Sequence, residues 1–211
     1  MTAGTAAMRP SEQGPPLLHD ARGGISNPVL GMLLFLTSEV MFFAGLFAAY
    51  FNVRAAAPQW PPAGFGDKLH VFPLIAPATV LLILSSFTCQ FGVWAIRRGD
   101  RTAFLRFIGV TVALRIVFLL MQATDYTLLF GDGLTLDSGV FGSTYYTLTG
   151  FHGAHVLGGV IMLSVILYRG MTGQFSARHH DAVEATSLYW HFVDIVWIVL
   201  FSTLYILPAS H

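Results

Sequence analysis

Five long apolar runs dominate the sequence, and each is long enough to cross a membrane as a helix. The runs occupy residues 28–51, 71–96, 103–130, 140–168 and 185–207. A helix needs about 20 apolar residues to cross roughly 30 Å of hydrocarbon. Because backbone polar groups in lipid must bond within the chain, such runs predict helices. We therefore expect an all-α, polytopic membrane protein whose five transmembrane helices form a bundle.

The charge composition argues against a water-soluble domain and against a nucleic-acid-binding protein. Only 10% of the 211 residues are charged, whereas a soluble domain carries about 25%. Eleven basic and eleven acidic residues cancel, so we expect no nucleic-acid partner. Residues 1–27 are polar and rich in Gly and Pro, which predicts a tail, and residues 28–207 are expected to form one membrane domain.

Basic residues in the loops predict how the helices run through the membrane. With five spans, the N-terminal tail shares a side with the second and fourth loops. That side carries Arg9, Arg22, Arg97, Arg98, Arg101, Arg106, Arg169 and Arg178. The opposite side carries only Arg54 and Lys68. Because cytoplasmic loops carry the excess of Lys and Arg, we expect a cytoplasmic N-terminus and an external C-terminus.

Ionisable side chains inside the apolar runs are candidates for function, because each costs at least about 2.5–3.5 kcal/mol at a helix centre. Glu39 in the first run is either a proton-exchanging carboxyl or a neutral acid hydrogen-bonded to another helix. Arg115, Gln122 and Asp125 share one face of the third helix. Asp125 is about 15 Å along the axis from Arg115. We therefore expect Arg115 to pair with Glu39 or another subunit, unless it extends to a headgroup.

The fourth run carries two histidines and a stripe of small residues. His152 and His155 are three residues apart and share a helical face. They either ligate a metal or haem, or form packing hydrogen bonds, which we favour because the ligand set is thin. Gly150, Ala154 and Gly158 repeat every four residues, and this stripe predicts the close approach of another helix.

One face of the fifth helix is polar. It carries Glu184, Ser187, His191 and Asp194. The pair of His191 and Asp194 either relays protons or forms a static hydrogen bond, which we favour. No nucleophile elbow, phosphate loop or metal-ligand motif occurs in the sequence. The residues alone are compatible with a transporter, a haem-binding cytochrome subunit or an accessory subunit of another membrane protein.

Several stretches, taken in order, resemble one family of membrane proteins. They are residues 35–43, 59–62, 122–126, 142–146, 149–156, 179–180, 184–185 and 189–197. The sequence resembles subunit III of the haem–copper cytochrome c oxidases over residues 28–207. Each stretch alone is a weak signal, but the full set of stretches in the family's order argues strongly against a chance match.

This resemblance implies a role in aerobic respiration, in an oxidase expected to be of the aa3 type. Subunit III carries no haem and no copper. It packs on catalytic subunit I, which holds both, in a complex that includes subunit II. The family is associated with sustained turnover, proton uptake on the inner side and bound phospholipid. Glu39 falls on the family's intramembrane glutamate, which favours its proton-linked interpretation, and metal ligation by His152 and His155 becomes unexpected.

The chain departs from the family's long form in two respects. The long form has two further helices before these five, so other subunits would have to supply one wall of its lipid cleft. Arg115 stands where the family has a small or apolar residue, so the resemblance assigns it no role. The short form, with no recognisable transit peptide, predicts a bacterial plasma membrane, and membership of a respiratory supercomplex stays open.

The sequence leaves three competing functions open. Two lie within the family: subunit III of a quinol oxidase, or a relative associated with nitric oxide reductase. The loop of Trp60, Pro61 and Pro62 favours the cytochrome c branch, and so does the histidine pair at residues 179–180. The third is a haem-binding membrane cytochrome that would use His152, His155 and His191. A transporter is disfavoured because the five runs are mostly unbroken.

Overall fold

The computed structural model describes residues 25–62 and 74–207, and these residues are mostly helical. The helices are α1 (Asn27–Ala56), α2 (Ala76–Arg97), α3 (Arg101–Gly131), α4 (Val140–Met171) and α5 (Asp181–Phe201), which continues into a π-helical turn, η3 (Ser202–Ile206). All five long helices have the length and apolar composition that a membrane crossing requires. The predicted all-α fold with five membrane-spanning helices is confirmed. The predicted tail lies almost entirely outside the described residues, as do Lys68 and the C-terminal end.

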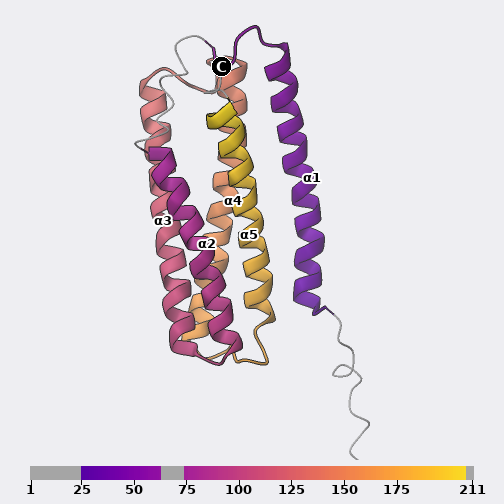
Figure 1. Ribbon diagram of the computed structural model, residues 1–211, viewed down its shortest axis with the longest axis vertical. Helices are drawn as coiled ribbons and strands as arrows, with labels where there is room; N and C mark the ends of the chain where they lie inside the picture. The colour runs from indigo at the N-terminus through magenta and orange to yellow at the C-terminus, as the bar shows by residue number, and fades with distance from the viewer. Residues whose placement is uncertain (1–24, 63–73, 208–211) are drawn as a thin grey trace, which may run out of the picture.

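Four of the helices form a ring, and α1 lies against its outside. α2 packs on α3 and α5, and α4 packs on the same two helices, which closes the ring. α1 contacts α5 and, less extensively, α4, and it stands at the edge of the bundle in Figure 1. α1 begins at the end that carries the α2–α3 and α4–α5 turns, whereas α5 ends at the opposite end (Figure 1). Which of these ends is cytoplasmic stays a prediction.

A tight turn joins α2 to α3 at the arginine-bearing end. Gly99 adopts a φ of +78°, a conformation that costs glycine little because it has no Cβ. The backbone N–H of Gly99 donates to the Ile96 carbonyl at 2.9 Å, which closes the end of α2. The Asp100 carboxylate accepts the backbone N–H of Ala103 at 2.9 Å and caps α3. The turn therefore reverses the chain with its backbone groups satisfied.

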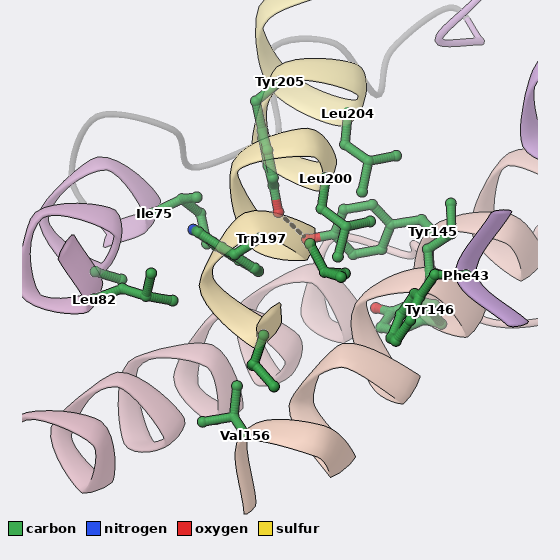
Figure 2. Close-up of a cluster of buried hydrophobic side chains, with 14 of the residues drawn as sticks. Phe43, Ile75, Leu82, Tyr145, Tyr146, Val156, Trp197, Leu200, Leu204 and Tyr205 are labelled. Atoms are coloured by element: carbon green, nitrogen blue, oxygen red, sulfur yellow. Dashed lines mark hydrogen bonds between the residues drawn. The ribbon is translucent and has the colours of Figure 1, made fainter. Parts of the chain in front are cut away.

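Apolar side chains fill the space between the helices in two clusters. Figure 2 shows part of the first cluster, in which Trp197 and Leu200 of α5 pack with Tyr145 of α4. The second cluster, nearer the arginine-bearing turns, surrounds Trp190. α1 buries only Phe43 and Tyr50 along its whole length. Its remaining apolar side chains are exposed or only partly buried, as expected for a helix that faces lipid or another subunit.

At the contact between α4 and α5, close packing depends on Gly159 and not on the predicted stripe. A Cβ on Gly159 would lie 2.4 Å from the ring of Trp190, so α4 and α5 approach closely there. In the predicted stripe, a Cβ on Gly150 or Gly158 would meet its nearest neighbour at 3.9 or 3.4 Å, and Ala154 is exposed. The stripe therefore remains a prediction, for a contact with another subunit.

Candidate functional site

A buried ion pair joins α3 to α5 in the middle of the bundle. Nη2 of Arg115 donates to Oδ1 of Asp194, and both side chains are almost completely buried. The guanidinium also lies over the ring of Trp190, 4.1 Å from its centre, in a cation–π contact. The expected pairing of Arg115 with Glu39 or another subunit is therefore wrong. Removal of either charge alone would leave an uncompensated buried ion, at a cost of about 3–5 kcal/mol.

His191 lies one turn before Asp194 on α5 but contacts α2 instead. Its Nε2 is 3.2 Å from Oε1 of Gln90, and its Nδ1 is 2.9 Å from Oγ of Ser86. Because the Gln90 oxygen can only accept, Nε2 carries a proton, and the neutral ring accepts the Ser86 hydroxyl at Nδ1. The structure thus places His191 and Asp194 on one face, as predicted, but His191 bonds to Gln90 and Ser86 and Asp194 bonds to Arg115, with Ser86 also close to Asp194.

A partly open pocket lies beside His191 at the arginine-bearing end. It has a volume of about 150 Å³. It is lined by Val29, Gln90, Val93, Arg97, Glu184, Ser187, Leu188 and His191. Glu184 holds Arg97 at 2.8 Å and His180 at 3.1 Å. The polar face predicted for α5 is thus turned toward α2, and its residues form the wall of this pocket and the ion pair beyond it.

A second intramembrane contact joins α1 to α4. Oε2 of Glu39 is 2.9 Å from Nε2 of His155, and Nδ1 of the same ring is 2.7 Å from the Phe151 carbonyl. The ring of His155 also meets Phe43 edge to face at 5.0 Å. Glu39 therefore bonds to a neighbouring helix, but its partner is a histidine that the sequence analysis treated separately.

The two histidines of α4 have different surroundings. His152 is fully buried, with its ring 4.9 Å from that of Trp197 and 6.2 Å from that of Phe118. His155 is only partly buried and points toward α1. His152 contacts aromatic rings rather than hydrogen-bonding groups among the described residues, so it does not form the packing hydrogen bond that we expected.

Asp125 belongs to a separate polar cluster near the opposite end of the bundle. Tyr145 donates its hydroxyl to Oδ2 of Asp125 at 3.0 Å, and its oxygen lies 2.7 Å from that of Tyr205 (Figure 2). Asp125 and Arg115 share the buried face of α3, as predicted. Sequence analysis missed both tyrosines, because an aromatic residue in an apolar run reads first as packing.

Sequence analysis also missed the α2 residues that contact the polar face of α5. Ser86, Gln90 and Arg97 follow one another at spacings of four and seven residues, which places them on one helical face. This spacing was the available signal. Each of these residue types is common on helix surfaces. The pattern therefore predicts a polar contact only when it is considered together with the polar residues of α5 that face it.

Known proteins similar to this chain share one family. The sequence profile described as "Cytochrome c oxidase subunit III" matches residues 22–209. The chain belongs to the cytochrome c oxidase subunit III family. It is 44% identical over 177 residues to the "Probable cytochrome c oxidase subunit 3" of Mycobacterium leprae, in a match that covers 83% of this chain and 86% of the relative. The "Cytochrome c oxidase subunit 3" of Synechocystis is 39% identical over 194 residues, 92% of this chain and 81% of the relative.

Membership of the subunit III family makes the chain a multi-pass membrane subunit of a haem–copper oxidase. A further relative, the "Cytochrome c oxidase subunit 3" of Corynebacterium diphtheriae, is 43% identical over 179 residues. The predicted resemblance is confirmed, and these relatives do not favour a quinol oxidase subunit, a nitric oxide reductase relative or a membrane cytochrome. The described residues contain no group of three or more His, Cys, Asp or Glu side chains placed to hold a metal ion. The polar networks around Arg115 and Glu39 are the candidate site of this accessory subunit.

Proposed function

We propose that this chain packs on subunit I of a cytochrome c oxidase, beside subunit II, in a bacterial plasma membrane. There it supports proton uptake and sustained turnover without a catalytic centre of its own. The family match over residues 22–209 is the observation that carries this proposal. Relatives from Mycobacterium and Synechocystis support the bacterial location.

The surroundings of the histidines support the proposal that partner subunits hold the haem and copper. An imidazole that ligates a metal must offer a free ring nitrogen. His155 and His191 each engage both ring nitrogens with protein atoms. His152 is enclosed by aromatic rings. His155 and His191 are thus committed to hydrogen bonds within the bundle, so His152, whose ring nitrogens have no partner among the described residues, is left without a second histidine as co-ligand.

The outer surface of α1 supports contacts with phospholipid or a partner subunit. Met41 and Leu34 are 73% and 67% exposed. A shallow groove between α1 and α4 is lined by Leu46, Ala49, Ser143, Thr144, Thr147 and Leu148. Its mostly apolar wall suits an acyl chain of a membrane lipid.

Depletion of this chain from the purified oxidase tests the accessory role. We expect the haem absorption spectrum of the remaining complex to stay unchanged, because we assign no metal ligand to this chain. Initial oxygen consumption should persist and then decay faster than in the intact complex. Loss of a haem band from a properly assembled subunit I would contradict the proposal, and so would a turnover lifetime that depletion leaves unaltered.

A further inference from the structure

Several polar atoms near the centre of the bundle have no hydrogen-bond partner among the described residues. They are Nε and Nη1 of Arg115, Oδ2 of its partner Asp194, Nε1 of Trp190 and both ring nitrogens of His152. The side chains of Arg115, Trp190 and His152 are fully buried, at 0% exposure, and that of Asp194 is 6% exposed. A buried polar atom without a partner is costly. The fold therefore requires partner atoms that this part of the chain does not supply.

These atoms belong to one region between α3, α4 and α5. The Arg115 guanidinium lies on the ring of Trp190, and the ring of His152 lies 6.2 Å from that of Phe118, one turn after Arg115 on α3. Because Arg115 is paired with Asp194, the charges in the region cancel. A neutral region rich in hydrogen-bond donors calls for a neutral polar partner rather than an ion.

Polar atoms continue from this region to the pocket at the arginine-bearing end. Ser187 and His191 line that pocket. Ser187 Oγ is 3.9 Å from the sulfur of Cys89 on α2, and His191 Nδ1 is 2.9 Å from Ser86 Oγ. The pocket is therefore a polar entrance whose lining residue His191 lies one helical turn from the ion pair.

We propose that water molecules occupy a blind internal site between α3, α4 and α5 and reach it through this pocket. Water suits the site because it both donates and accepts, and a buried water typically bonds about three otherwise unpartnered groups. Arg115 and Trp190 donate to it, and neutral His152 donates through one ring nitrogen and accepts through the other. Bound water thus completes the polar cluster.

Aromatic rings close the site on the side away from the pocket. Phe118 and Trp197 pack edge to face with their ring centres 5.0 Å apart, and His152 lies against Trp197. Trp197 donates its indole N–H to the Thr79 hydroxyl at 3.0 Å, which holds the ring in place. Water therefore enters and leaves from the arginine-bearing end, and the buried ion pair is hydrated without a water path through the membrane.

Cysteine reactivity in the purified oxidase complex tests this inference. On a Cys89→Ala background, Ser187→Cys places a thiol on the pocket wall, and Ser86→Cys places one beyond it. Thr186→Cys and Ser85→Cys are the controls on the same two helices. Thr186 is as buried as Ser187, at 6% exposure, and neither control residue lines the pocket. The probe is 2-aminoethyl methanethiosulfonate, which reacts with thiolates that water reaches.

The mass of this chain over time gives the reaction rate of each variant. We expect Ser187→Cys and Ser86→Cys each to react at least about tenfold faster than the control on the same helix. Haem absorption and co-purification show that each variant has assembled. A rate for Ser86→Cys no higher than that for Ser85→Cys would overturn the inference, because water would then stop at the pocket wall.

A density map of the unaltered complex, at a resolution that shows ordered water, is a check that needs no variant. We expect water density within hydrogen-bonding distance of Arg115 Nη1 and of a His152 ring nitrogen. A map of that quality without such density would overturn the inference. The same holds if these side chains turn to pair fully with protein groups of this chain or of a partner subunit.

Discussion

The carbonyl of Phe151 determines how many protons Glu39 and His155 share. A carbonyl oxygen only accepts, so Nδ1 of His155, at 2.7 Å from it, carries a proton. The 2.9 Å contact between Nε2 and Glu39 then holds one proton. It sits either on the carboxyl beside a neutral ring or on the ring beside a carboxylate. Both arrangements have no net charge, which lowers the cost of the pair inside a membrane.

Glu39→Gln separates a proton-linked role from a packing role. The glutamine amide donates to Nε2 of His155, so the contact and the assembly of the complex should survive. The amide cannot exchange a proton, so we expect lower proton pumping or a shorter turnover lifetime in reconstituted vesicles. Glu39→Ala is the matched control: it removes the contact and should weaken attachment of α1 by about 1–3 kcal/mol. Wild-type pumping and lifetime in an assembled Glu39→Gln complex would show that the residue only packs.

At the scale of the helices, the α4–α5 contact depends on a glycine that leaves room for an indole ring. Gly159 faces the rigid indole of Trp190, and the same indole carries the Arg115 guanidinium on its ring. The position of Trp190 therefore couples helix packing to the buried ion pair. α1 has no such contact; it is held by the pair with His155 and by Tyr50, whose hydroxyl donates to the Thr203 carbonyl at 3.0 Å.

Gly159→Ala should destabilise the chain by about 1–3 kcal/mol, because the new methyl group overlaps an indole ring that has little room to move. The measurement is the midpoint of thermal dissociation of this chain from the purified complex. Gly109→Ala on α3 is the control, since a Cβ there meets nothing within 4 Å, and alanine favours a helix. Equal midpoints for the two variants would show that α4 and α5 lie further apart than described.

For the molecule as a whole, the odd number of spans places the beginning of α1 and the end of α5 on opposite sides of the membrane. The α2–α3 and α4–α5 turns lie at the same end as the beginning of α1 (Figure 1), and this end carries most of the arginines. The pocket opens there too, beside Arg97. The positive-inside rule therefore predicts that the pocket, and with it the access to the water site that we propose, faces the cytoplasm.

Cysteine labelling in intact cells tests this orientation. On a Cys89→Ala background, Arg98→Cys marks the α2–α3 turn and Asp137→Cys marks the α3–α4 loop, and both positions are exposed. A membrane-impermeant maleimide should label Asp137→Cys in intact cells and Arg98→Cys only after the cells are opened. Labelling of Arg98→Cys alone in intact cells would invert the topology.

Hydropathy was enough to predict the number and type of the elements, because in lipid each helix satisfies its backbone within itself. Helical spacing also predicted which residues share a face: Arg115 with Asp125 on α3, and His191 with Asp194 on α5. The family, too, could be recognised from short stretches in order. These properties depend on residues close together in the chain, so sequence patterns carry them.

The partners of the buried polar groups depended on tertiary structure. Arg115 bonds Asp194, 79 residues away, and Glu39 bonds His155, 116 residues away. Neither pairing follows from spacing along one helix, because each requires the rotation and depth of two helices relative to one another. Packing sets that rotation, as where Gly159 admits the ring of Trp190. A side chain inside a membrane must find a polar partner, but which partner it finds is decided by how the helices pack.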